Sequence, residues 1–248
     1  MADKVFHTKG IVLRTVKYGE TSVITLIFTE MFGIQSYLVN GVRMSSRKSP
    51  GKAGMFQPPA ILDMVVYHNE LKQLQRIKEF RWAFIYQQIL SDVRKNAVAV
   101  FMVELLTKRL KQPEPNAELF HFAEDAFLHL DTANDAITAN LPLFFAVHLP
   151  VFFGLRIHDN YSEQFPYLDL VEGEFVKERP RHPHFLEEKQ AAVTSHLLKV
   201  QQPLELEEIK LNHEFRRNLL HAYENYYHQH IQDFGSMRTL PVLREILG

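Results

Sequence analysis

The chain of 248 residues contains no cysteine. This excludes disulfides and cysteine-ligated zinc, and it gives no sign of an oxidising compartment. The sequence also lacks a glycine-rich phosphate loop, an HExxH motif and a GxSxG motif, so the signatures of three common hydrolytic sites are missing. The adjacent Glu187 and Glu188 stand where a helix is expected to begin, which is where its dipole favours acidic side chains. We therefore expect no catalytic residue, no cofactor and no enzyme activity.

An uninterrupted hydrophobic run of membrane-spanning length is also missing. The most apolar segment, residues 141–155, is shorter than the roughly 20 apolar residues that span a bilayer. Pro142 and Pro150 interrupt it, and we interpret it as a buried helical segment. Residues 1–10 contain no apolar core of a secretory signal. The sequence predicts a cytoplasmic protein that does not meet a membrane.

The net charge is small, but charge is distributed unevenly along the chain. The net charge is −1. Residues 1–81 hold 12 Lys/Arg and 6 Asp/Glu, a net charge of +6, whereas residues 82–248 hold 16 and 23, a net charge of −7. This asymmetry favours contact with nucleic acid by the N-terminal part alone, although chance clustering of solvated charge explains it equally well.

The first part of the chain is typical of β structure. Apolar runs of strand length alternate with glycine or polar turns, and no helical pattern interrupts them. The five expected strands are residues 5–16, 23–28, 34–39, 61–67 and 71–80. The continuous apolar run at 23–28 predicts a strand that is covered on both faces. A five-stranded barrel of the OB-fold type removes the sheet edges and matches this length, so we assign it to residues 1–81.

The remaining residues, 82–248, predict a helical domain. Apolar residues recur there at helical spacing. The expected helices are residues 82–93, 96–112, 116–130, 135–155 (kinked or broken at its prolines), 187–200, 212–233 and 239–247. A β-hairpin is expected as an insertion at about residues 160–185, with its turn at Glu172 and Gly173. The predicted fold class is therefore α+β.

Thirteen histidines are many, and two groups resemble partial metal sites. One is His182 with His184, and the other is His221, His228 and His230. Neither group has the spacing of a zinc site or an obvious acidic third ligand. We interpret these residues as surface or capping histidines and expect no metal.

Binding of nucleic acid is the function that the N-terminal residues favour. Single strands are bound by basic grooves lined with aromatic side chains. The predicted DNA-binding residues are Arg14, Lys17, Tyr18, Arg43, Arg47, Lys48, Lys52, Lys72 and Arg76. Tyr37 and Tyr67 are interleaved with them, although any one tyrosine has packing of the barrel as its simpler role. For Arg43, Arg47 and Lys48 the simpler alternative is a solvated loop.

Four short motifs carry a resemblance to a known family. They are Leu13-Arg14 at the end of a strand, a Tyr18-Gly19-Glu20 turn, Phe28-Thr29 at the next strand end, and Gly41-Val42-Arg43. This run resembles the N-terminus of the bacterial recombination mediator family RecO. The ending TLPVLREIL is also similar to that of the family.

The resemblance implies an OB-fold followed by a helical domain. It also implies binding of single- and double-stranded DNA, annealing of complementary strands, and work near the nucleoid. The implied partners are RecR, in some cases RecF, and RecA, which is loaded onto DNA coated by single-strand-binding protein.

Two further family features concern the helical domain. Many members carry a four-cysteine zinc module, which a chain without cysteine does not share; the 160–185 hairpin stands in its place. Members also bind the acidic, Phe-ended tail of single-strand-binding protein, which needs an apolar pocket with a basic rim. Lys108, Arg109 and Arg156 are the residues we expect there.

Two alternatives belong to other functional classes. The chain is a protein-interaction adaptor if its OB-fold binds a protein rather than DNA. A nuclease needs clustered acidic metal ligands, and the few acidic residues of 1–81 are spread out.

Overall fold

The computed structural model describes residues 4–44 and 52–247. Contacts divide the chain into two compact units. The barrel unit comprises Met1–Gln87 and Leu106–Phe127, and the helical unit comprises Gln88–Leu105 and Leu128–Gly248. The domain boundary at residue 81 stays a prediction.

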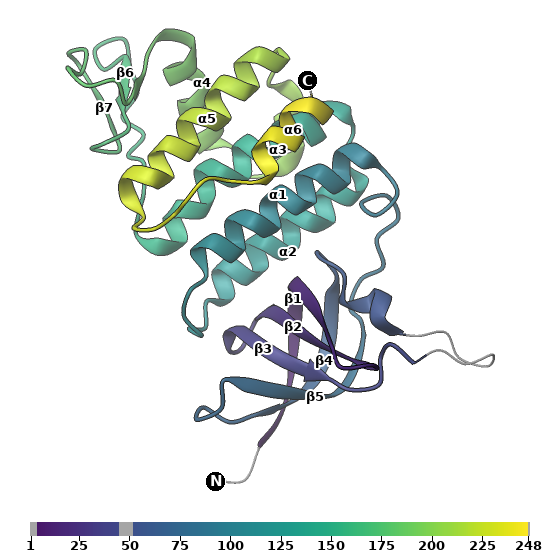
Figure 1. Cartoon of the computed structure of the whole chain (residues 1–248). Helices are drawn as coiled ribbons and strands as arrows, with labels where there is room; N and C mark the ends of the chain where they lie inside the picture. The colour runs from purple at the N-terminus through teal and green to yellow at the C-terminus, as the bar shows by residue number, and fades with distance from the viewer. Residues whose placement is uncertain (1–3, 45–51, 248) are drawn as a thin grey trace. The chain divides into compact units, whose positions relative to one another are not determined.

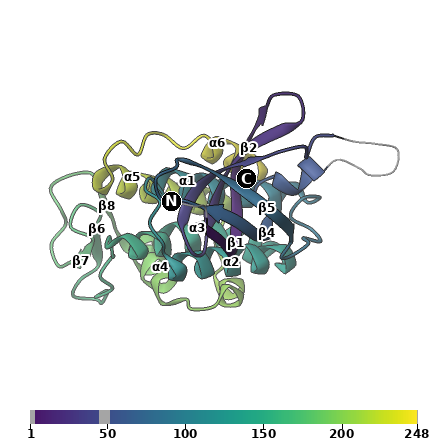
Figure 2. The same cartoon turned by 90° about the horizontal axis from the view of Figure 1, so that it is seen from below.

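The predicted five-stranded barrel is confirmed, and with it the α+β fold (Figure 1). Its strands are β1 (Lys4–Tyr18), β2 (Ser22–Thr29), β3 (Gly33–Val39), β4 (Ile61–His68) and β5 (Leu74–Trp82). They close in the order β1-β2-β3-β5-β4, and every pairing is antiparallel except that of β3 with β5. In Figure 2 the turn of the β1–β2 hairpin extends away from the rest of the barrel. The short helix η1 (Lys52–Phe56) lies between β3 and β4.

Alternation of side chains along each strand produces the interior of the barrel. Val12, Ile27, Tyr37 and Met64 are fully buried there. The register of β1 shifts at Leu13, between Val12 and Arg14. Beyond this bulge Arg14 is exposed on the outside of the barrel.

Residues from the helical part of the sequence complete the barrel unit. The ring of Phe28, on the outside of β2, lies 5.6 Å from the ring of Phe120. Gly33 has a φ of +62°, and a Cβ there would overlap the backbone carbonyl of Glu114. The segment around residues 114–120 therefore packs directly on the β2–β3 end of the barrel.

Helices dominate the rest of the chain. Two of them, α1 (Val93–Arg109) and α2 (Ala117–Thr132), run from one unit into the other. The helical unit adds α3 (Asp135–His148), η2 (Leu149–Phe153), α4 (Glu188–Lys199), η3 (Pro203–Glu208), α5 (His213–His230) and α6 (Thr239–Ile246). The core helix α3 packs against α4, α5 and η3.

The predicted helix at residues 82–93 is wrong. The buried carboxylate of Asp131 accepts hydrogen bonds from the backbone N–H groups of Gln88 and Ile89, at 2.8 and 2.9 Å. Asp92 accepts from the N–H groups of Arg94 and Lys95, which is the geometry of a helix start. The helix therefore begins only at Val93.

The apolar segment at residues 141–155 is largely buried, as predicted. It is not broken at Pro142, since α3 continues through that residue and ends at His148, before Pro150. The run Asp135–Phe153 has the length and composition of a membrane span, but 67% of its apolar window is buried inside the structure. It is therefore better explained as the core helix of a folded unit.

The predicted hairpin insertion is confirmed and is larger than expected. β6 (Tyr167–Asp169) pairs with β7 (Glu174–Val176), and a third strand, β8 (Phe185–Leu186), pairs with the other edge of β6. Two-residue strands such as β8 have no readable alternation in sequence, which is why the third strand was not predicted.

Candidate nucleic-acid interface

One outer face of the barrel brings together several of the N-terminal residues that the sequence singled out. Residues directly opposite each other in paired strands point to the same side of the sheet. Arg14, Leu26, Ser36 and Leu74 form one such row, and Val16, Ile24, Leu38, Arg76 and Tyr67 form the next. We call these residues, with Tyr18 at the end of β1, the barrel face.

The middle of the barrel face is apolar. Ile24, Leu26 and Leu38 are partly exposed, and Val16 and Leu74 are exposed by 41% and 39%. The prediction that the 23–28 run is covered on both faces is thus correct at Phe28 and wrong at Ile24 and Leu26. An open apolar floor of this kind offers contact area to the faces of bases.

Two arginines at the edges of this floor, Arg14 and Arg76, have no ion-pair partner in the part of the chain that the structure describes. Other cations of the barrel unit are neutralised, since Lys9 pairs with Glu124, Lys78 with Glu79 and Arg81 with Asp63. Positive charge available to a ligand therefore remains at the barrel face.

Arg43 has a structural contact that the sequence did not reveal. Its guanidinium donates a hydrogen bond to the backbone carbonyl of Gly19 at 3.0 Å, and its own N–H donates to the carbonyl of Thr21. The side chain is half-buried. Arg43 thus fixes the β1–β2 turn next to Tyr18, and its remaining N–H groups are available to a phosphate.

Lys72 lies in the β4–β5 turn, which a buried amide organises. The Nε2 atom of Gln75 donates to the carbonyls of Asn69 and Lys72, at 2.8 and 2.6 Å, and its Oε1 accepts from the N–H of Asn69. Gln75 is only 3% exposed. The turn is therefore held in one shape with Lys72 on its exposed side.

The structure separates other predicted residues from this face. Lys17 is exposed, but it pairs with Val23, whose side chain is in the core, so it points to the opposite side from Arg14. Lys52 lies over the ring of Phe80, with Nζ 5.6 Å from its centroid. Arg47 and Lys48 lie outside the described residues.

The tyrosines divide between the two roles considered for them. Tyr37 is fully buried, and burial raises the pKa of its hydroxyl. Tyr67 is partly exposed beside Arg76. Tyr18 is 53% exposed at the end of β1 and is the aromatic side chain best placed to stack on a base.

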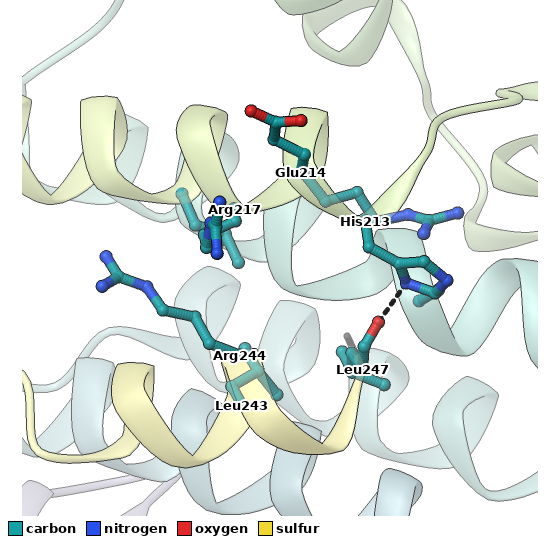
Figure 3. Close-up of a pocket in the computed structure, with 9 residues that line it drawn as sticks. His213, Glu214, Arg217, Leu243, Arg244 and Leu247 are labelled. Atoms are coloured by element: carbon teal, nitrogen blue, oxygen red, sulfur yellow. Dashed lines mark hydrogen bonds between the residues drawn. The ribbon is translucent and has the colours of Figure 1, made fainter.

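The helical unit contains a pocket of about 270 Å³ that no sequence pattern predicted. Its apolar part comes from Leu220 of α5 with Leu243 and Leu247 at the end of the chain. Figure 3 shows Arg217 of α5 and Arg244 of α6 on its two sides. We call it the arginine pocket. A hydrogen bond from the His213 ring to the Leu247 carbonyl closes one end.

A third arginine in this pocket is held by a buried amide. The Nε atom of Arg216 donates to Oδ1 of Asn140 at 2.9 Å, and Asn140 itself donates to the carbonyls of Leu206 and Ile209. Burial lowers the pKa of Arg216. Its guanidinium has no carboxylate partner in the described parts of the chain, so its remaining N–H groups can still donate to an anion.

The residues predicted to meet an acidic tail are distributed differently. Lys108 and Arg109 end α1 and belong to the barrel unit, and both are half-buried. Arg156 is exposed in the helical unit. None of the three lines the arginine pocket.

The two histidine groups have ordinary protein contacts. His182 pairs with Asp169 at 3.1 Å, and His230 shares a hydrogen bond of 2.9 Å with the Leu170 carbonyl. His221 lies 3.7 Å from Glu224. No cluster of three His, Cys, Asp or Glu side chains suited to a metal occurs among the residues that the structure describes.

These features define a protein class: an OB-fold barrel with an open apolar and basic face, joined to a helical unit. Comparison with known proteins gives the family. The model described as "Recombination protein O N terminal" matches residues 1–86, and "Recombination protein O C terminal" matches residues 90–238. The chain belongs to the RecO family.

Curated relatives agree along almost the whole length. Proteins named DNA repair protein RecO from Christiangramia forsetii and Phocaeicola vulgatus are each 30% identical to it. The match with the first relative covers 98% of this chain and all of the relative. The match with the second covers 97% of this chain and 98% of the relative. The DNA repair protein RecO of Flavobacterium psychrophilum is 32% identical over 97% of this chain and 98% of its own. The recognition made from four short motifs is confirmed.

Proposed function

We propose that this chain is a non-enzymatic DNA repair protein that binds single- and double-stranded DNA, anneals complementary strands, and helps to load RecA onto DNA coated by single-strand-binding protein. It works in the cytoplasm at the nucleoid, with RecR and in some settings RecF. The family membership supports the repair role. The barrel face supports the DNA-binding step.

The observation that carries the proposal is the arrangement of the barrel face. Arg14 and Arg76 lie at the two sides of a floor that contains Leu26 and Leu38. Phosphates of one strand neutralise the arginines while bases lie on the apolar floor and on Tyr18. Stacking and phosphate contacts do not read base identity, so binding is independent of sequence. That is the property an annealing protein requires.

A salt series with labelled single-stranded DNA tests this proposal. Each neutralised phosphate of a single strand contributes a slope of about −0.7 to the dependence of log affinity on log salt. The double variant Arg14→Ala, Arg76→Ala should therefore lose about 1.4 of slope and about 25-fold in affinity near 0.1 M salt. Arg81→Ala is the matched control, because Arg81 is an exposed arginine of the same strand that already pairs with Asp63 at 2.6 Å.

A wild-type chain that does not bind single-stranded DNA at low salt would contradict the proposed function. Binding that the double variant leaves unchanged would instead contradict the assigned face. Annealing of complementary oligonucleotides should fall in the double variant in parallel with affinity.

The arginine pocket is the surface we propose for the acidic, Phe-ended tail of single-strand-binding protein. Three arginines line it against one carboxylate, that of Glu214, so its net positive charge matches acidic side chains and a terminal carboxylate, and its leucines accept an aromatic ring. This site competes with the sequence-based prediction of Lys108, Arg109 and Arg156. Titration of a fluorescent peptide of that chemistry separates the two.

The double variant Arg217→Ala, Arg244→Ala should weaken peptide binding at least tenfold if the pocket is the site. The double variant Lys108→Ala, Arg109→Ala should weaken peptide binding instead if the sequence-based prediction is correct. Arg179→Ala is the control, since Arg179 is exposed in the same unit and lies 3.5 Å from Glu187.

The second candidate function is a protein-interaction adaptor. The apolar floor of the barrel face favours it, because exposed apolar side chains that lie together, such as Val16 and Leu74, are typical of protein interaction surfaces. An adaptor predicts partner capture that is insensitive to salt and no annealing of oligonucleotides.

A further inference from the structure

A groove of about 480 Å³ adjoins the barrel face at the β4–β5 turn. It lies entirely within the barrel unit. Its walls come from β2 and β3, from the β4–β5 turn, and from the connector between α1 and α2 at Leu110, Lys111 and Pro113. We call it the connector groove.

The floor of the connector groove continues the floor of the barrel face. Leu26 belongs to the barrel face and to the groove, and Ile34 is the neighbour of Ser36 on the outer side of β3. Leu110 adds an apolar side chain from the connector and is itself 7% exposed. A strand lying across the barrel face therefore finds a continuous apolar surface on which to extend.

The connector wall has a fixed position. Its backbone at Glu114 contacts Gly33 so closely that no side chain fits there, and the φ of +62° at Gly33 is itself a glycine conformation. The N–H of Leu110 still donates to the carbonyl of Leu106 at 2.8 Å, which extends the end of α1. Pro113 and Pro115 then restrict the backbone on the two sides of Glu114.

The rim of the connector groove carries charge of both signs. Lys72 and Lys111 are exposed on it, and Glu70 is exposed between the β4 and β5 strands. Lys111 has no ion-pair partner in the described ranges of the chain. A phosphate in this groove gains from the two lysines and is repelled by the glutamate.

We infer that the connector groove receives the nucleotides that continue beyond the barrel face, with Lys111 and Lys72 at their phosphates. This inference rests on the proposed function and extends it, since it adds a segment outside the strands of the barrel to the DNA path. It also assigns a role to Glu70, which limits the affinity of this part of the path.

Two single-residue variants with opposite expected effects test the inference. Lys111→Ala should weaken binding of an oligonucleotide of about 20 nucleotides about fivefold near 0.1 M salt and reduce the salt slope by about 0.7. Glu70→Gln should strengthen the same binding. An oligonucleotide of about 5 nucleotides, near the lower end of the site size of one OB fold, should respond to neither variant.

Two controls separate this inference from the function on which it rests. Lys78→Ala removes an exposed lysine of the same unit that already lies 3.6 Å from Glu79, and it should change neither affinity. Arg76→Ala should weaken binding of both oligonucleotides.

Unchanged binding of the long oligonucleotide by both Lys111→Ala and Glu70→Gln, with the Arg76→Ala loss intact, would overturn the inference and leave the proposed function standing. Loss of affinity in both variants would also overturn it, since the two charges then act through the fold. A wild-type chain that binds neither oligonucleotide would overturn both.

Discussion

Lys9 on β1 and Glu124 on α2 form an ion pair between positions 115 residues apart, with Nζ at 2.9 and 3.2 Å from the two carboxylate oxygens. Glu124 is nearly buried, whereas Lys9 is about half exposed. The pair neutralises one of the cations of residues 1–81, so that cation is not available to a ligand. Charge counted along a sequence thus overstates the charge that a surface presents.

Lys9→Ala should reduce the free energy of unfolding by about 1 kcal/mol without changing affinity for DNA, because it leaves the Glu124 carboxylate without its cation. The hydrogen bond to Glu124 raises the pKa of Lys9 above 10.5. A raised pKa means that this stabilisation is present below pH 10.5 and is lost as pH rises through the folded-state value. Urea denaturation of both chains at neutral and at strongly alkaline pH measures the difference, which should shrink at the higher pH. A fall in DNA affinity in Lys9→Ala would contradict the assignment of Lys9 to an ion pair rather than to DNA binding.

Tyr18 and Tyr37 should respond in opposite ways to substitution. Tyr18→Ala should weaken single-stranded DNA binding by about 1–3 kcal/mol, the usual contribution of one stacked base, and leave thermal stability unchanged. The hydroxyl of Tyr37 is buried without a hydrogen-bond partner among the described residues, so Tyr37→Phe should keep or raise stability by up to about 1 kcal/mol. Equal effects of the two substitutions on DNA affinity would refute the placement of Tyr18 on the barrel face and Tyr37 in the barrel core.

His148 should make the helical unit sensitive to mild acid. Its Nε2 atom lies 2.9 Å from the carbonyl of Leu197, and burial lowers its pKa below 6.5. As pH falls through 6.5, His148 takes up a proton in the unfolded chain but not in the folded chain. The free energy of unfolding therefore declines between pH 6.5 and the lower pKa of the folded state. His148→Gln should flatten this part of the stability profile in circular dichroism melts at a series of pH values. A profile identical to that of the wild type would exclude His148 as the cause.

The β6–β8 sheet should hold its shape without metal. Asn160 pairs with the backbone of Phe175 in both directions, at 2.8 and 2.9 Å, and Asp169 accepts from the N–H groups of Val171 and Glu172. Asn160→Ala should therefore cost about 1–3 kcal/mol, since it leaves two backbone groups of Phe175 unsatisfied. EDTA should leave the melting temperature of the wild type unchanged. A large fall with EDTA would show that metal stabilises this sheet after all.

Local patterns were sufficient for the barrel and for most helices. Alternation of apolar and polar residues between turn glycines, as at Gly19 and Gly33, gives strand positions without knowledge of distant partners. The prediction of a helix at residues 82–93 was wrong because Asp131, some 40 residues later, accepts hydrogen bonds from the N–H groups of Gln88 and Ile89, which a helix would have used. No local signal reports such a contact.

The candidate sites show the same limit. Arg76 was predicted to bind DNA from its type, but its place beside Leu38 depends on the one parallel pairing of the barrel. Ile24 and Leu26 were misassigned because a half-open apolar face and a fully covered one have the same sequence. Arg217 and Arg244 line one pocket, although most of α5, a loop and the first turn of α6 separate them in the sequence.

The position of Phe120 against Phe28 has a consequence for biosynthesis. When residue 82 has left the ribosome, all five strands have been made, yet Phe120, which covers Phe28 on the outside of β2, has still to be made. Phe120 is made only after residues 88–105, which belong to the other unit. The nascent barrel therefore emerges with Phe28 uncovered, and its completion waits for translation to reach the second helix.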